Sequence, residues 1–493
     1  MSAGFAEFGG TIGALGVALM VLRPGRRERI AGLGAWAIGS GMLVLYLAPA
    51  GHHRAYAAAA VVGAIVAALL AWVYVRRPWL LAVSVLLCAP ARIPVSVGHT
   101  TANLLLPLYL VVASAALALA WQAFDEQSVE LIHGEPVLLP ATPEGPPLGA
   151  LSTPLAAFIA WTGISYLWTV DPRQGAIYLL FFVLPFGLLA VALTRLRWHL
   201  RWNIRLAALI GLMAAIFGAI GLWQYATRNV FWNPKVIVDN AYAPSSWFYR
   251  VNSVFYDPSI YGRFLVVALT VTVVVTLFTR NRTALIGASA TGIIFAGLVP
   301  SFSQSSFVAL AVVLVALLVV VWGRRAVTPL VAIALVLALG SLAVPAVRHK
   351  VLGTHGLSHA TGGRSKLVSN GLKVAFDRPI FGAGTGGFRR AYAEVTHLKG
   401  KEPKAAASHD TPVTIAAEGG IPLLAIFAWV LVTVFGLAFR GTEVVTAVGR
   451  VRLVYGLALL AMVTHSLFYD SLFEDPIFWS LFALVPVAFK ERA

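Results

Sequence analysis

Long apolar runs separated by short polar segments make up most of the chain. About fifteen runs approach the length of about 20 residues that an α-helix needs to cross a bilayer, although the run at 79–90 is short for a full crossing. The pattern therefore predicts an all-α polytopic membrane protein with about 12–15 transmembrane helices. The runs lie at 4–22, 30–49, 56–75, 79–90, 103–121, 151–168, 174–194, 206–224, 261–279, 283–300, 306–322, 327–345, 420–439, 453–469 and 475–489.

Basic residues alternate between the loops. Arginine-rich segments such as 23–29, 195–205 and 440–452 are followed by loops that carry few cations. Because short loops rich in Lys and Arg stay in the cytoplasm, this alternation predicts an N-terminus outside and a C-terminus inside. The acidic, proline-containing segment 122–150 is then a linker on the inner side. No basic residue precedes the first run, so we expect a retained span there and not a cleavable signal peptide.

Composition supports the same architecture. The 493 residues are 59% hydrophobic and 12% charged, with a mean hydropathy of +0.83, whereas soluble domains carry about 25% charged residues. Soluble enzymes, disordered regulators and fibrous repeats are thereby excluded. The net charge of +17 does not indicate nucleic acid, because the cations lie in short clusters between apolar runs. The single cysteine, Cys88, excludes an internal disulfide and a cysteine-based zinc site.

Two segments between the apolar runs, 225–260 and 346–419, are longer than the usual short loops, and they divide the chain into four parts. We expect an N-terminal transmembrane bundle over 1–224 and a central bundle over 225–345, with a short outer loop at 225–260. An extracytoplasmic loop over 346–419 follows, and transmembrane helices over 420–493 complete the chain.

This long loop is basic. Residues 346–415 carry eleven Lys and Arg against four Asp and Glu, together with five of the eleven histidines. Loops longer than about 60 residues escape the rule that keeps cations inside. Such a loop is either free to be basic or meets an anionic ligand, and charge alone leaves both interpretations open.

Two stretches of the loop carry local structural signals. Residues 364–377 predict a short amphipathic helix ended by Pro379, and the glycines within 382–387 predict a tight turn between two surface helices. A nucleotide-binding loop is the less favoured interpretation, because neither a preceding strand nor a Walker lysine is present.

His409 lies just before a predicted helix start. Asp410 or Thr411 is a good N-cap, and Pro412 suits the first helical position. Unpaired N–H groups at such a start favour anions, so His409 is either an ordinary surface residue or a functional group. We expect this short helix to end at the following glycine pair, before Pro422 begins the next span at a new angle.

The aromatic segment 247–263 contains two further cations. Arg250 lies just outside the membrane, whereas Arg263 falls in the first turn of a span, where an unpaired cation is costly. Arg263 could extend outward to water, pair with Asp257 or face a cavity.

Together these segments resemble the family of O-antigen ligases and polymerases, which are membrane glycosyltransferases that use lipid-linked sugars. The similarity covers roughly 245–440, and the N-terminal third is similar only in hydropathy. The residues that carry it are Arg250 to Pro258 (Arg-x-x-Ser-x-Phe-x-x-Pro), Ser303-Gln304-Ser305-Ser306, Arg364, Pro379 to Gly384, His409-Asp410 and Glu418 to Pro422.

The resemblance implies an outward-facing transferase of the GT-C type. In that family loop arginines bind the diphosphate of a polyprenyl-diphosphate glycan, and a loop histidine activates the acceptor hydroxyl. By position, Arg250 and Arg364 are the diphosphate ligands and His409 is the general base, and we add Arg263 as a further candidate ligand. The supporting candidates are Asp410, Glu418, Arg389 and Arg390.

Guanidinium groups can stabilise a departing diphosphate without a metal. We therefore expect an inverting glycan ligase or polymerase that needs no metal or other cofactor. Its expected location is the cytoplasmic membrane, with the active site on the extracytoplasmic face. Its expected partners are the lipid-linked donor, a glycan or glycolipid acceptor and membrane lipids, but not nucleic acid.

Two positions depart from the family pattern, and two other functions stay open. Ser305-Ser306 stands where an arginine is common, and Asp410 follows the histidine in place of Asn. A transporter or flippase of lipid-linked sugars is the main alternative. It predicts ionisable residues midway along the spans, and the runs 283–300 and 306–322, for example, contain none. A structural scaffold is the third possibility, and the sequence does not separate ligase from polymerase.

Overall fold

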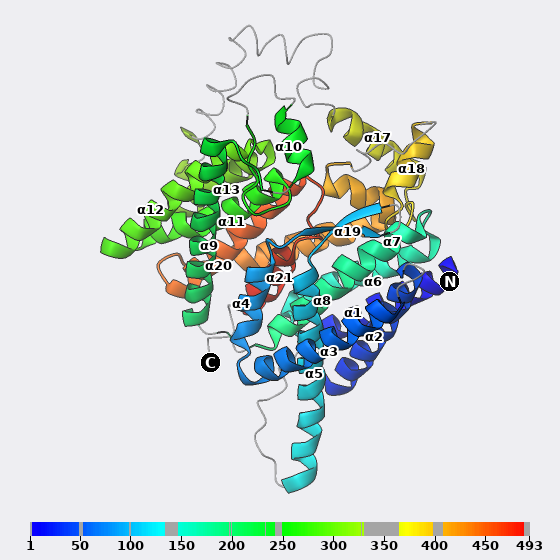
Figure 1. The fold of residues 1–493 in the computed structure, drawn as a ribbon. Helices are drawn as coiled ribbons and strands as arrows, with labels where there is room; N and C mark the ends of the chain where they lie inside the picture. Colours follow the sequence, from blue (N-terminus) through cyan, green and yellow to red (C-terminus); the bar gives the residue numbers. More distant parts are fainter. Residues whose placement is uncertain are drawn as a thin grey trace.

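The computed structural model describes residues 2–48, 53–97, 100–133, 146–196, 198, 200–231, 233–241, 249–326, 328–329, 364–397 and 408–487. Within these residues eleven helical segments are long and apolar enough to cross a membrane (Figure 1). The predicted all-α polytopic architecture is confirmed. The α-helices are α1 (Ala3–Leu22), α2 (Arg26–Leu47), α3 (His53–Arg76), α4 (Trp79–Cys88), α5 (Leu106–His133), α6 (Ser152–Ser165), α7 (Pro172–Tyr178), α8 (Leu184–Thr194), α9 (Leu200–Thr227), α10 (Pro234–Ala241), α11 (Pro258–Phe278), α12 (Asn281–Leu298), α13 (Gln304–Trp322), α17 (Arg364–Asp377), α18 (Phe388–Val395), α19 (Thr411–Phe439), α20 (Ala447–Ser466) and α21 (Pro476–Val487).

The predicted runs correspond to these helices, with one short exception. Helix α4, with 10 residues, falls below the length of a full span, as the sequence indicated for the run at 79–90. The apolar stretches Ala60–Arg76 of α3 and Pro476–Pro486 of α21 are also short, but α3 as a whole has 24 residues and α21 ends at the limit of the described residues. The predicted span 327–345 lies almost entirely outside the described residues, as do 346–363 and 398–407 of the long loop.

One small element was not predicted. Strands β1 (Ile93–Val97) and β2 (Thr100–Leu104) form an antiparallel hairpin between α4 and α5, in which Ile93 pairs with Leu104. The residues on both sides of this hairpin are helical, so the hairpin does not alter the fold class.

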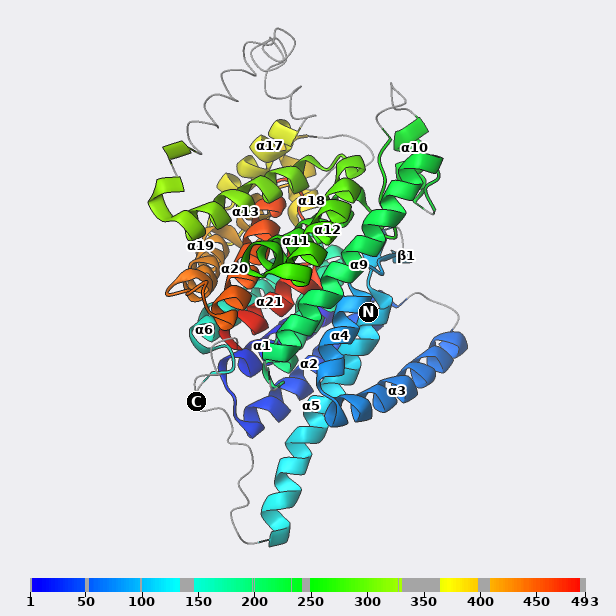
Figure 2. The same cartoon turned by 90° about the vertical axis from the view of Figure 1, so that its left-hand side faces the viewer.

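Two arginine-rich segments, around Arg26 and Arg195, lie together at one end of the bundle, which we call the basic end. Arg195 Nη2 donates a hydrogen bond to Pro24 O at 2.8 Å, and Arg26 Nε donates to Ala123 O at 2.7 Å. These contacts bring together the ends of α1 and α8, the start of α2 and the middle of α5. The far end of α5 points downward in Figures 1 and 2, which places the basic end at the bottom.

The opposite end, which we call the polar end, joins the end of α9, the start of α11 and the end of α12. Val251 N donates to Pro300 O at 3.0 Å, which ties the chain before α11 to the end of α12, and Gln224 near the end of α9 bonds Ser253 O at 3.0 Å. The starts of α13, α19 and α21 and the end of α20 lie here too. In Figures 1 and 2, α10 and α17 mark this end at the top.

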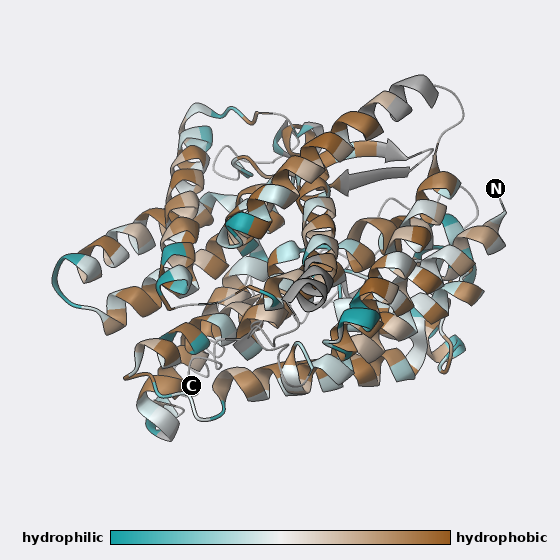
Figure 3. Ribbon diagram, turned by 90° about the horizontal axis from the view of Figure 1, so that it is seen from below, coloured by the Kyte–Doolittle hydropathy of each residue, from teal (hydrophilic) through white to brown (hydrophobic). Residues whose placement is uncertain are grey.

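Helix α11 is among the more enclosed helices. It packs against α9, α12, α13 and α20, and most of its side chains are buried. In contrast, α9 and α12 expose large apolar side chains such as Leu212 and Ile286. Seen from below, hydrophobic residues follow the outward faces of the helices as well as the interior (Figure 3). Such apolar outer faces fit helices surrounded by lipid.

A glycine-rich turn joins the loop helices α17 and α18 to the spans. Ala383 N donates to Ala417 O and Gly384 N donates to Glu418 O, both at 2.8 Å. Gly384 has φ of +80°, and a Cβ built there would lie 2.3 Å from Cα of Thr169. Only glycine fits such a position, because it tolerates positive φ and needs no side-chain space. The predicted tight turn between two helices is confirmed.

Helix α19 is broken where the sequence indicated a change of direction. Gly420 has φ of +72°, two residues before Pro422. Ile421 N donates to Pro379 O at 2.7 Å, so the glycine-rich turn supplies a partner for backbone that the break frees. The first part of α19 therefore belongs to the polar end, and the rest forms the span.

Candidate active site

The chain turns sharply at His409 before α19 begins. His409 is half-buried and has φ of +54°, a left-handed conformation that is uncommon for residues other than glycine. Asp410 caps the helix, because its Oδ1 accepts a hydrogen bond from Val413 N at 3.0 Å. The Ser408 hydroxyl accepts from Asp410 N at 3.0 Å and fixes the turn from the other side. The predicted N-cap is confirmed, and His409 occupies a defined position at the start of α19.

The connection 467–475 between α20 and α21 carries three acids, and each binds a different part of the fold. Asp470 contacts the start of α19, Glu474 contacts Arg92 before β1, and Asp475 contacts Arg263 in α11. Arg92 Nη1 lies 3.1 Å from Glu474 Oε2, and Arg92 Nη2 donates to Glu474 O at 2.7 Å. We call this segment the acidic connection. It holds three elements of the polar end in fixed positions.

Asp470 lies directly beneath the helix start that follows His409. Its Oδ1 accepts from the Thr411 hydroxyl at 2.9 Å and its Oδ2 from the Thr414 hydroxyl at 2.5 Å. Burial raises the pKa of Asp470 to about 6, although the two threonine hydrogen bonds oppose the rise. This carboxyl group therefore titrates close to neutral pH.

Replacing Asp470 with Asn should change the pH dependence of stability. Since the pKa of the folded state lies above the unfolded value, the folded protein binds more protons between about pH 4 and pH 6. The stabilisation from Asp470 is thus complete at low pH and is lost as the pH rises through 6. Between pH 4 and pH 7 the free energy of unfolding of wild type should therefore fall, relative to that of the Asn variant, by up to about 3 kcal/mol. Denaturant unfolding in detergent at both pH values measures this, and a pH-independent difference would contradict it.

Arg263 has a different partner from the one considered in the sequence. Its Nη2 lies 2.7 Å from Asp475 Oδ2 and its Nη1 donates to Ser471 Oγ at 2.8 Å, while its side chain is only 2% exposed. Asp257 instead caps α11, where its Oδ1 accepts from Ser259 N at 2.6 Å. Among the described residues, the pairing of Arg263 with Asp257, one of the three alternatives considered from the sequence, is thus not formed, because the aspartate is used in the cap.

Arg250 is half-buried and fastened by its backbone as well as its side chain. Its Nε donates to Ser301 O at 3.1 Å, its backbone N donates to Asn240 Oδ1 at 2.9 Å, and its carbonyl accepts from Asn240 Nδ2 at 3.0 Å. Ser301 ends the short turn Val299–Ser301 between α12 and α13. Arg250 therefore sits over the start of α13.

A row of polar side chains leads from this point to His409. The hydroxyls of Ser303, Ser305 and Ser306 contact one another, and Ser305 Oγ lies 2.9 Å from Nε2 of the buried His465. The ring of Tyr469 lies between two histidines, with its centroid 5.8 Å from that of His465 and 6.5 Å from that of His409. Arg250 and His409 are both half-buried and lie at the partly exposed surface of the polar end, which we call the polar surface. The row that connects them consists of largely buried side chains, among them the serines at the position of the family's arginine.

The long loop contributes helices α17 and α18 beside this surface. Only the backbone of Arg364, the first residue of α17, is described, and its side chain lies outside the described part of the chain. Helix α17 packs on the first part of α19, where a Cβ on Gly371 would lie 2.7 Å from Val413. The helix that carries Arg364 is therefore in contact with the helix that follows His409.

Glu418 supports the start of α18. Its Oε1 accepts from Phe388 N at 3.3 Å, so the carboxyl group of Glu418 satisfies one of the N–H groups that have no partner within the first turn of the helix. Arg389 and Arg390 follow directly on α18. Arg389 is half-buried, whereas Arg390 is exposed and donates from Nη1 to Val170 O at 3.0 Å. These four residues come together on the side of the polar end that faces α6 and α7.

Sequence reasoning missed Arg92, Asp470, Glu474, Asp475 and His465 as parts of this centre. A signal was present, because three of only 20 acids in the chain lie within 470–475, just outside a span. Among the described residues no group of three or more His, Cys, Asp or Glu side chains is arranged to hold a metal ion.

Comparison with known proteins adds one match. Residues 290–428 match the family model described as O-antigen ligase. The match runs from within α12 to a point in α19 eight residues beyond the break at Gly420, and so includes His409, Glu418 and the loop helices. It confirms, over these residues, the resemblance noted from the sequence motifs. No curated protein matches the chain significantly.

Proposed function

We propose that this protein, which is similar to the O-antigen ligases over residues 290–428, transfers a glycan from a polyprenyl-diphosphate donor to an acceptor hydroxyl. The observation that carries the proposal is that Arg250 and His409 lie at the same end of the helices and are connected by a row of polar side chains, with α17 packed on the helix that follows His409. Guanidinium groups and a histidine at one end of the bundle suit a reaction that expels a diphosphate and activates a hydroxyl.

The arrangement of charges supports an active site on the extracytoplasmic face. The arginine-rich segments around Arg26 and Arg195 lie at the basic end, and short loops rich in Lys and Arg remain in the cytoplasm. The polar surface lies at the opposite end of the same helices. With the basic end in the cytoplasm, the candidate site opens at the outer leaflet of the cytoplasmic membrane.

In the proposed reaction the acceptor oxygen forms a bond to the anomeric carbon as the bond from that carbon to the diphosphate oxygen breaks. His409 takes the proton of the acceptor hydroxyl, and the bonding electrons leave with the polyprenyl diphosphate. Arg250 and Arg364 stabilise the charge that gathers on this leaving group. A single direct displacement inverts the anomeric configuration, and none of these steps calls on a metal ion.

The remaining candidates take supporting roles in this proposal. Arg263 is buried in its pair with Asp475, so we assign it to positioning α11 against the acidic connection and not to direct diphosphate contact. Asp410 and Glu418 hold the starts of α19 and α18. Arg389 and Arg390 extend the cationic surface that a phosphorylated or acidic acceptor would meet.

The test is a transfer assay with the full chain reconstituted in vesicles. The vesicles contain an oligosaccharide on polyprenyl diphosphate and a glycolipid acceptor. We expect an acceptor–glycan bond of inverted anomeric configuration and an equal amount of free polyprenyl diphosphate. Movement of the donor across the bilayer without formation of a glycosidic bond would contradict the proposal and favour a flippase.

A further inference from the structure

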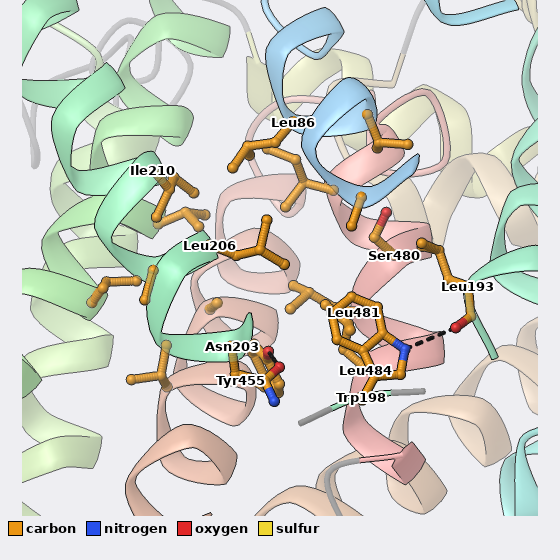
Figure 4. Close-up of a pocket in the computed structure, with 18 residues that line it drawn as sticks. Leu86, Leu193, Trp198, Asn203, Leu206, Ile210, Tyr455, Ser480, Leu481 and Leu484 are labelled. Atoms are coloured by element: carbon orange, nitrogen blue, oxygen red, sulfur yellow. Dashed lines mark hydrogen bonds between the residues drawn. The ribbon is translucent and has the colours of Figure 1, made fainter. Parts of the chain in front are cut away.

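An apolar cavity lies inside the helix bundle, away from the candidate active site. It has a volume of about 110 Å³ and is lined by residues of α4, α9, α11, α20 and α21 (Figure 4). In Figure 4, Leu206 and Ile210 of α9 and Leu481 of α21 extend into this shared space. An engineered apolar cavity of about 150 Å³ stays dry and binds benzene, so a space of this size and character suits a segment of hydrocarbon.

The polar side chains around the cavity are engaged with the protein itself. Tyr455 OH donates to Asn203 Oδ1, and Trp198 Nε1 donates to Leu193 O at 2.8 Å. Ser480 Oγ donates to Pro476 O at 2.7 Å. The lining therefore presents mainly carbon to an occupant. A polar ligand would find few partners here, whereas an alkyl chain would bury apolar surface.

One side of the cavity reaches the basic end. Asn203 and Ala207 in its lining lie within the first turns of α9, beside the exposed arginines Arg201 and Arg205. Trp202 stacks on Trp79 at the start of α4, with 4.8 Å between ring centroids, and the Arg205 guanidinium lies 4.6 Å from the Trp202 ring. Tryptophan and arginine together mark the level of the lipid headgroups.

The other side of the cavity ends below a buried ion pair. Val267 lies one helical turn beyond Arg263, and Ile477 follows two residues after Asp475. The pair between Arg263 and Asp475 thus stands between the cavity and the polar surface. A chain whose headgroup is held at the polar end would have to pass this desolvated charge pair, whereas a lipid at the basic end meets cations and an apolar space directly.

From this arrangement we infer that the cavity binds an acyl chain of an anionic phospholipid, whose headgroup lies against Arg201 and Arg205. Basic pockets between membrane helices on the cytoplasmic side attract anionic lipid headgroups. The binding does not depend on the transferase activity, because the cavity lies on the other side of the Arg263–Asp475 pair. The bound acyl chain would fill the space where the short helices α4 and α21 meet α9.

The experiment is a lipid titration of the purified full chain in neutral detergent, followed by native mass spectrometry. The added lipids are phosphatidylglycerol, phosphatidylcholine with the same acyl chains, and a polyprenyl phosphate. Wild type should bind phosphatidylglycerol most tightly. The variant Ala207→Phe, which fills the cavity, should weaken both phospholipids about tenfold, while Ala208→Phe on the exposed side of the same helix should not.

A charge variant tests the headgroup separately and leaves the core intact. Arg201→Gln with Arg205→Gln should weaken phosphatidylglycerol on the order of tenfold and leave phosphatidylcholine unchanged. The matched control, Arg280→Gln with Arg282→Gln, removes the same charge from exposed positions near the junction of α11 and α12. Equal effects of test and control variants would overturn the inference. Tighter binding of polyprenyl phosphate than of phosphatidylglycerol would also overturn it and would make the cavity an isoprenoid site.

Discussion

Replacing His409 with Asn is expected to leave the protein folded and to lower the transfer rate about 10²- to 10⁴-fold, the usual contribution of a general base. Asn is the preferred replacement because His409 has φ of +54°, and Asn tolerates the left-handed conformation better than Ala does. The Asp410 cap and the Ser408 turn rely on neighbouring groups and should persist. The loss should therefore appear in kcat, with little change in melting temperature.

His397 provides a matched control for this experiment. It lies at the end of α18, is exposed and also has positive φ, at +51°. His397→Asn should retain the wild-type rate. A second check is the pH profile, since loss of the base should remove the ascending limb of the rate near neutral pH. Wild-type transfer by a folded His409→Asn protein would eliminate His409 as the base.

Arg250→Ala is expected to lower kcat by about 10²- to 10³-fold, the magnitude that accompanies the loss of one preorganised donor to a developing negative charge. Within the described part of the chain the guanidinium bonds Ser301 O through Nε, and its two terminal nitrogens are the groups that we expect to contact the diphosphate. Arg250→Lys keeps the charge but loses the planar fork, so it should recover only part of the rate.

Arg378→Ala is the control for charge alone. Arg378 lies in the long loop, is exposed and pairs with Glu394 at 3.3 Å. Its removal subtracts the same charge from the same end of the molecule and should change the rate less than twofold, as is usual for an exposed ion pair. Equal rates for Arg250→Ala and Arg378→Ala would show that Arg250 contributes only to the overall positive electrostatic potential of this end of the molecule.

Local features of the fold could be predicted from the sequence because their causes lie close together in the chain. The spans follow from apolar runs of helical length. The cap at Asp410, the break at Gly420 and the glycine-rich turn each depend on a few neighbouring residues whose backbone preferences are strong. The candidate residues Arg250 and His409 came from motifs of this local kind, and the structure brings their segments together.

The partners of buried charges could not be predicted in the same way. The nearest acid to Arg263 in sequence is Asp257, but its carboxylate caps α11, and the arginine pairs with Asp475 near the other end of the chain. Such pairs depend on which helix ends meet in space. The sequence shows the three acids of the acidic connection but not which elements each one contacts.

The acidic connection limits how this chain can diverge. Asp470, Glu474 and Asp475 fasten three separate elements within one short segment. An insertion or deletion between them would move at least one acid away from its partner and leave a buried arginine or two threonine hydroxyls unmatched. We therefore expect evolution to preserve the length of this segment even where its apolar residues drift, and to accommodate changes of length in the exposed loops of the opposite end.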